Sequence, residues 1–309
     1  MLFQHRAGPE PEHTDLDEGL KRFGALGVPI VPCAKVQMPI SRGMLFGIHS
    51  LLFNETFTEK DLPLLDKCKG LGFDAVELIP FDPDNFPAKQ TKQAADDLGL
   101  RINTGYGMPL DHNVISPDAK VRRKGHELTR RLIDLSNDAG AVVFGGAIYC
   151  GWGYLSGKKR SEDEWEWGVE ACRKAAEYAQ ETSDLIIAIE PLNRFESHFI
   201  NIAEDAVKFI EAVDMPNMKV HLDTFHMIRE EDDIPQAVRD TGSHLGYVHA
   251  CENQRGIPGR GLVPWKEFFL ALKEVGYDDC ITIESFDPDM ENIAKLICIW
   301  RKLAGSPEE

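Results

Sequence analysis

From residue 45 onward, short runs of β-branched and aliphatic residues alternate with longer segments whose apolar positions recur at helical spacing. This alternation is typical of repeated strand–helix units that build a parallel sheet. The apolar runs predict eight strands, at residues 45–50, 75–79, 101–105, 142–149, 186–190, 219–223, 245–249 and 281–284. The clearest predicted helices cover residues 59–71, 119–139, 162–182, 203–213 and 265–275.

The number of alternating units favours a closed barrel over an open, doubly wound sheet. No strand leads into a GxGxxG dinucleotide fingerprint, and the glycine-rich segment at residues 152–158 begins with Trp152 where a phosphate-binding loop needs glycine. We therefore predict an α/β fold, a single (β/α)8 TIM barrel that forms a catalytic domain over residues 44–309.

Residues 1–43 precede the first predicted strand and form an N-terminal extension. They contain five of the eighteen prolines and a single short amphipathic segment, residues 16–26. This composition favours a flexible extension, or an upstream start with Met44 as the functional beginning. The alternative is a helix that caps the floor of the barrel or contacts another subunit.

Composition narrows the possible partners and the location. The formal net charge of −17 repels phosphate backbones, which excludes nucleic acid as an expected partner, and attracts divalent cations. The seven scattered cysteines contain no CxxC pair, which is typical of reduced thiols in a cytosolic protein. Since the chain has no apolar run long enough for a membrane span and no hydrophobic signal core, we predict a cytoplasmic protein without membrane contact.

Four metal-binding residue types lie at the ends of successive predicted strands: Glu190, Asp223, His249 and Glu284. Their separations of 33, 26 and 35 residues each correspond to one strand–helix unit. Because the carboxyl ends of barrel strands meet at one mouth, the four side chains should converge there. One such residue alone would more often be solvated or cap a helix, but four in phase predict a metal site. Its mainly oxygen donors suit Mn2+, Co2+ or Mg2+.

Three more polar residues follow these ligands in the same loops. Glu196 lies six residues after Glu190, His226 three after Asp223, and Arg255 six after His249. Together they could surround a polyol with one acceptor and two donors. The alternatives are a loop ion pair for Glu196 and Arg255, and packing for His226.

Such a site can move a proton next to a carbonyl. A divalent ion chelated by a carbonyl oxygen and a neighbouring hydroxyl acidifies the adjacent C–H bond. One carboxylate then removes the proton to give a metal-bound enediolate, and a second carboxylate on the opposite face returns a proton and inverts the carbon. Glu190 and Glu284 are the natural pair. An isomerase needs only one such group, so the spacing permits both epimerase and isomerase chemistry.

Four motifs in order resemble the D-tagatose/D-psicose (allulose) 3-epimerase family of ketose 3-epimerases, in the xylose-isomerase-like TIM barrel superfamily. These motifs are Glu190-Pro-Leu-Asn-Arg-Phe-Glu196, Leu222-Asp-Thr-Phe-His-Met227, His249-Ala-Cys-Glu-Asn-Gln-Arg255 and Pro258-Gly-Arg-Gly261. The similarity extends over residues 44–302 and is densest over residues 186–286.

The resemblance implies a metal-dependent isomerase, with Mn2+ or Co2+ held by the four strand-end residues and with Glu190 and Glu284 as the acid/base pair. It implies that Glu196, His226 and Arg255 hold the substrate oxygens near C1 to C3. It also places Glu77 at the pocket and Trp152 against the sugar. The family further implies a homo-oligomer, a dimer or a tetramer.

One departure bears on the substrate. His49 stands in the first strand where the epimerases usually place an aromatic residue, so we expect it to contact a more polar or differently shaped substrate. We predict an epimerase that inverts C3 of a free ketose. The alternatives are an aldose–ketose isomerase, or an epimerase of an oxidised sugar or glycoside, on the same metal site.

Overall fold

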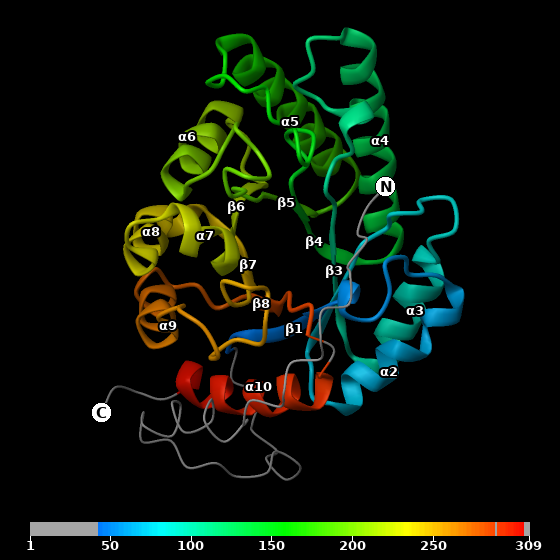
Figure 1. The fold of residues 1–309 in the computed structure, drawn as a ribbon. Coiled ribbons are helices and arrows are strands. Elements are labelled where there is room, and N and C mark those ends of the chain that lie inside the picture. Colours follow the sequence, from blue (N-terminus) through cyan, green and yellow to red (C-terminus); the bar gives the residue numbers. More distant parts are fainter. Residues whose placement is uncertain (1–42, 288, 306–309) are drawn as a thin grey trace, which may run out of the picture.

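The computed structural model describes residues 43–287 and 289–305, apart from a few side chains in the last helix. Apart from Gly43, the predicted extension, including the segment at residues 16–26, therefore lies outside the described residues. Eight parallel strands close into a barrel in which each strand pairs with its neighbours in chain order (Figure 1). They are β1 (Leu45–His49), β2 (Ala75–Leu78), β3 (Arg101–Gly105), β4 (Ala141–Gly146), β5 (Ile186–Ile189), β6 (Met218–Asp223), β7 (Leu245–Ala250) and β8 (Cys280–Ile283). The predicted TIM barrel is confirmed.

The helices surround this barrel as an outer layer (Figure 1). They are α2 (Pro63–Gly70), α3 (Ala88–Leu98), α4 (Ala119–Asp138), α5 (Glu162–Thr182), α6 (Ala203–Val213), α7 (Thr224–Glu230), α8 (Ile234–Thr241), α9 (Trp265–Glu274) and α10 (Met290–Gly305). Short 3-10 helices cover Ser50–Leu52, Glu59–Asp61, Leu110–His112 and Gly242–His244. Among the described residues, no helix is both long and apolar enough to span a membrane.

Two predicted elements differ from the structure by more than one residue at an end, each for a local reason. The strand predicted to run to residue 149 ends at Gly146, whose φ of 107° turns the backbone out of the sheet. A Cβ there would lie 2.6 Å from the Tyr106 carbonyl oxygen, so this turn requires glycine. The helix predicted at residues 59–71 is divided, because Pro63 lacks a backbone N–H and begins α2 instead of continuing the turn before it.

The inside of the barrel is narrow and partly polar. Its apolar residues form a small cluster separate from the large one between strands and helices, made of Ala75, Val143, Ala188, Tyr247 and Cys280. Gly47 adds no side chain, and a Cβ there would lie 2.6 Å from the Thr282 hydroxyl oxygen. Small residues thus leave room for the buried polar side chains of Glu77, Asn103 and His221.

Helix α10 covers the seam where β1 and β8 pair, and it completes the helical layer (Figure 1). Its Trp300 side chain has no exposed surface. The Trp300 ring centroid lies 6.0 Å from that of Phe46, 5.0 Å from that of Trp265 and 5.3 Å from that of Phe269. This aromatic cluster joins the first strand to the last two helices of the barrel.

Replacing Trp300 should therefore destabilise the whole barrel. We expect Trp300→Ala to lower the free energy of unfolding by about 3–5 kcal/mol, because it removes a large buried ring and leaves a cavity. Urea unfolding followed by circular dichroism measures this change. Phe195→Ala is the control, because the Phe195 side chain is 73% exposed and its loss should cost less than about 0.5 kcal/mol. Equal losses in the two variants would contradict the role given to α10.

Candidate active site

The four strand-end residues that the sequence predicts to form a metal site lie together in the structure. Glu190 directly follows β5, Asp223 ends β6, His249 is the penultimate residue of β7, and Glu284 directly follows β8. All four side chains are buried, and one donor atom from each lies within 4.8 Å of those of the other three. Parallel strands that end at one mouth explain this convergence of residues far apart in sequence.

Two donor atoms of this cluster have no hydrogen-bond partner among the described residues. The Asp223 Oδ2 and His249 Nδ1 atoms are buried and make no hydrogen bond with any described residue. His249 Nδ1 lies 3.5 Å from Glu284 Oε2 and 4.0 Å from Glu190 Oε1. Buried polar atoms without partners cost free energy, so their convergence on one point fits a bound cation. Three carboxylates and one imidazole are suitable ligands for Mn2+ and similar divalent ions.

The pKa shifts of the cluster also indicate a site for a bound cation. Burial raises the pKa of Glu190 well above its usual range, and the negative charges of Asp223 and Glu284 add to that effect. Burial and the neighbouring Glu284 raise the pKa of Asp223 to about 6. Burial also disfavours the charge of Glu284, but Arg255 and His249 outweigh it and hold the pKa of Glu284 well below its usual range. In the cation-free protein, the charges of Arg255 and of a protonated His249 therefore favour ionised Glu284. A divalent cation, whose binding would displace the His249 Nδ1 proton, would supply the positive charge that Glu190 and Asp223 lack.

Arg255 lies against the ligands from the loop between β7 and α9. Its guanidinium forms an ion pair with Glu284, and its Nη1 atom lies 3.8 Å from Asp223 Oδ2. The guanidinium carbon lies 4.0 Å above the ring of Phe225 and 5.1 Å from that of Phe286. Aromatic contacts and a carboxylate thus hold the charge of Arg255 at the mouth of the barrel.

Asn193 links the other predicted sugar contacts. Its backbone N–H donates to His226 Nδ1 at 2.9 Å, which leaves His226 Nε2 3.5 Å from Glu190 Oε1. The Asn193 side-chain amide donates to Glu196 Oε1 at 2.9 Å, and the indole N–H of Trp152 donates to Glu196 Oε2 at 2.8 Å. The predicted residues on these loops therefore meet in one network, in which Asn193 was not singled out by the sequence.

His49 and Glu77 are both fully buried below the mouth. His49 Nδ1 accepts a hydrogen bond from the Leu51 backbone N–H at 3.1 Å. His49 Nε2 lies 3.8 Å from Glu284 Oε1 and 3.9 Å from Glu77 Oε1. Glu77 itself is hydrogen-bonded to His249, so it lies beneath that residue on the side away from the other ligands.

Sequence reasoning missed two buried residues that support the cluster from below. His221 has no hydrogen bond from either ring nitrogen among the described residues, and its ring centroid lies 4.0 Å from that of His249. Tyr247 lies 5.3 Å from the His249 ring. Each precedes a strand-end ligand by two residues, and the twofold alternation of a strand turns both inward with that ligand. That alternation was the signal that could have found them.

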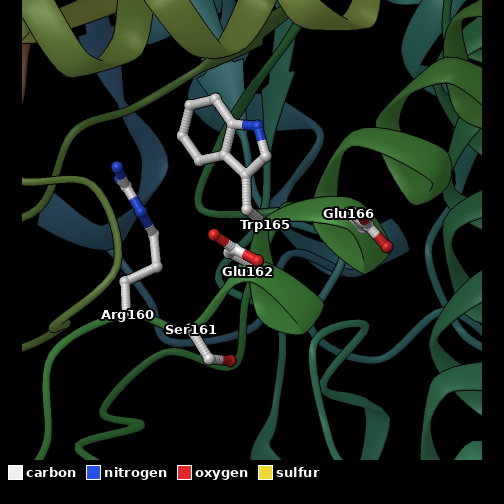
Figure 2. A pocket seen from close by; sticks show the side chains of 5 residues that line it. All are labelled: Arg160, Ser161, Glu162, Trp165 and Glu166. Atoms are coloured by element: carbon white, nitrogen blue, oxygen red, sulfur yellow. The ribbon is translucent and has the colours of Figure 1, made fainter.

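A separate hollow of about 310 Å³ lies outside the barrel at the start of α5. Figure 2 shows the side chains that line it, which are Arg160, Ser161, Glu162, Trp165 and Glu166. The guanidinium carbon of Arg160 lies 4.3 Å above the Trp165 ring. None of these residues belongs to the cluster at the strand ends, and the convergence of buried donors distinguishes the barrel mouth as the candidate active site.

Comparison with known proteins agrees with the fold and with the motifs. The family model of the xylose isomerase-like TIM barrel matches residues 65–303. The chain is 33% identical to a D-psicose 3-epimerase of Ruminiclostridium cellulolyticum over 271 residues, which are 86% of this chain and 92% of that protein. It is 34% identical to an L-ribulose 3-epimerase of Mesorhizobium japonicum over 260 residues, 83% of this chain and 87% of that protein.

A solved structure of a D-allulose 3-epimerase from Methylomonas sp., in complex with D-allulose, superposes with a TM-score of 0.80 at 28% sequence identity. That match covers 86% of this chain and 99% of the other. The chain therefore belongs to the ketose 3-epimerase family of xylose isomerase-like TIM barrels. It is an enzyme of the isomerase class, as the motifs predicted.

A metal ion at this cluster should stabilise the fold. Because a ligand that binds only the native state adds to its stability, Mn2+ at about 100 times its dissociation constant should raise the free energy of unfolding by about 2.7 kcal/mol. Urea unfolding of chelator-stripped and Mn2+-loaded protein measures this gain. His249→Ala should lose most of it, whereas Asp74→Asn should keep it, because Asp74 accepts from the Phe46 backbone N–H at the opposite end of the barrel. An undiminished gain in His249→Ala would count against the ligand assignment.

Proposed function

We propose that this enzyme inverts C3 of a free ketose with the help of a divalent cation held by Glu190, Asp223, His249 and Glu284. The observation that carries the proposal is the placement of two carboxylates around one centre. Glu190 and Glu284 follow β5 and β8, which are separated by two strands in the closed barrel. From these positions they would approach a bound sugar from different sides. Inversion of a carbon needs one acid/base group on each face.

The other residues have roles in binding and orientation. His226 Nε2 and the Arg255 guanidinium are donors that face the cluster, so they would hold the sugar oxygens next to the reacting carbon. Glu196 would accept from a hydroxyl through its remaining lone pairs, with Trp152 against the sugar ring. His49 would contact the sugar from the β1 side.

The cation and the two glutamates would have different roles in the reaction. When bound, a divalent ion polarises the carbonyl and acidifies the neighbouring C–H bond. One glutamate then takes the proton from C3, and the other gives a proton to the opposite face. Mn2+ is the ion that we propose, with Co2+ and Mg2+ as the alternatives that the same donor set accepts.

We further infer that the enzyme acts in the cytoplasm as a homo-oligomer, a dimer or a tetramer. The five described cysteines, all buried, are free thiols, which is typical of a reducing compartment. The oligomeric state follows from the family resemblance. Sedimentation equilibrium measures it directly, and a mass of one chain would contradict this inference.

The reaction itself is tested by deuterium exchange. The enzyme is stripped with chelator, reloaded with Mn2+ and incubated in D2O with a panel of ketoses, while NMR follows the sugar protons. We expect deuterium at C3 together with the C3 epimer. Label at C1 with formation of an aldose would instead establish an isomerase. A metal-loaded enzyme that exchanges no free ketose would direct the search to oxidised sugars or glycosides.

The two-face mechanism predicts that Glu284→Gln abolishes epimerisation. The amide cannot take or return the proton, so kcat should fall by at least ~100-fold, the usual contribution of a general acid or base. Steady-state kinetics at saturating Mn2+ measures this loss, and circular dichroism checks the fold. Asp74→Asn is the matched control and should keep its activity. Retained epimerisation in Glu284→Gln would remove Glu284 from the acid/base role.

A further inference from the structure

We propose that Glu77 is a positioning residue that holds His249 with its Nδ1 atom toward the metal site, and that it does not contact the sugar. This inference deepens the proposed function, since it rests on the same metal site. It differs from the role that the family resemblance implies for Glu77, which is a place at the substrate pocket.

The contact with His249 selects one tautomer of the imidazole. The Nε2 atom of His249 lies 2.5 Å from Glu77 Oε2. The carboxylate can only accept, so the proton of that hydrogen bond belongs to Nε2. A neutral imidazole with its proton on Nε2 has its lone pair on Nδ1, and Nδ1 is the atom that faces Glu190 and Glu284 without a hydrogen bond. Glu77 therefore keeps available the nitrogen that a cation needs.

Hydrogen bonds from residues deeper in the barrel fix the position of the Glu77 carboxylate. The Tyr247 hydroxyl donates to Glu77 Oε2 at 2.7 Å, and its oxygen lies 2.6 Å from the Thr282 hydroxyl and 3.1 Å from the Asn103 amide nitrogen. Because the Tyr247 proton goes to Glu77, Thr282 and Asn103 act as the donors to the tyrosine oxygen. The side-chain oxygen of Asn103, Oδ1, in turn accepts from Arg101 Nε at 3.1 Å. A column of hydrogen bonds thus runs from the start of β3 up to His249.

Protein groups enclose the Glu77 carboxylate, and this enclosure, not burial alone, distinguishes it from the proposed sugar contacts His49 and His226, which are buried as well. The exposed fraction of Glu77 is 1%. A Cβ on Gly105 would overlap the Oε1 atom, so the backbone of β3 closes over the carboxylate on that side. On the other side, Oε1 faces His49 Nε2 at 3.9 Å. Since the His49 Nδ1 atom accepts from the Leu51 backbone, its proton lies on Nε2 and points toward Glu77 and Glu284.

The same contacts argue against a second ion between these residues. His49, Glu77 and His249 have the residue types of a metal site, and their donor atoms lie within 4.8 Å of one another. However, the Nε2 protons of both histidines point at the carboxylate, and the distance of 2.5 Å between Glu77 and His249 leaves no room for an ion. We therefore expect no ion between these three residues. A further candidate group, Glu190, His221 and His249, shares Glu190 and His249 with the main cluster, so we expect one metal ion per chain.

The test is metal binding by Glu77→Gln in the absence of sugar. An amide is a weaker acceptor than a carboxylate and presents an N–H to His249 or Tyr247, so Mn2+ affinity should fall about 10–100-fold. Isothermal titration calorimetry measures this affinity and the stoichiometry, and the visible spectrum of the Co2+ form reports the ligand field. At saturating Mn2+, the KM for the ketose should equal that of the wild type. An unchanged Mn2+ affinity with a raised KM would overturn the proposal and indicate that Glu77 contacts the sugar. Two bound ions per wild-type chain would also overturn it.

A second variant and a direct measurement complete the test. Tyr247→Phe removes one donor to Glu77, so it should weaken Mn2+ binding, but less than Glu77→Gln does. If Glu77→Gln does not fold, an unchanged Mn2+ affinity in Tyr247→Phe would overturn the proposal. NMR of 15N-histidine-labelled, Mg2+-loaded enzyme should show His249 protonated on Nε2, and a proton on Nδ1 would contradict us. Asp74→Asn should match the wild type throughout. Because metal binding is measured without sugar, these results stand apart from whether the enzyme epimerises a ketose.

Discussion

The mutual repulsion of three buried carboxylates is the constraint on which the rest of this structure depends. Glu190, Asp223 and Glu284 converge at one end of the barrel, where burial disfavours their charges and Arg255 and His249 are the main groups that oppose that effect. A divalent cation would resolve this conflict. The orphaned oxygen of Asp223 and the orphaned nitrogen of His249 are the atoms that would receive it. The site is thus a buried, mainly anionic cluster, and the residues proposed to bind the sugar lie around it.

The barrel interior below the site also serves the proposed cation site, because it orients the His249 imidazole. An imidazole ligand must present one chosen nitrogen, and a buried hydrogen bond from the other nitrogen fixes that choice. Glu77 accepts this bond, and Tyr247 fixes Glu77 in turn. The room for these side chains comes from residues with little or no side chain, such as Gly47 and Ala75. The hydrogen-bonded polar side chains therefore fit inside the barrel only because the neighbouring residues are small.

The loops above the site carry the residues that we propose to bind the sugar, and hydrogen bonds link them to one another and to the strand ends. Asn193 places His226 and Glu196 with its main-chain and side-chain donors, and Trp152 completes the network from the β4–α5 loop. Rigid strand ends hold the groups that would carry out proton transfer, while the loops that follow them hold the groups that would bind the sugar.

The sequence by itself determined the barrel and the positions of the four strand-end residues, because strand periodicity and helix length are local properties and parallel strands must end at the same mouth. It also pointed to Glu196, His226 and Arg255, which follow those ends in the same loops. Only the tertiary structure decided what Glu77 contacts, since its partner His249 is 172 residues away in the chain. The same holds for His221 and Tyr247 beneath the ligands. These contacts depend on the closure of the barrel and on the space that small residues on other strands leave, which no local pattern in the chain records.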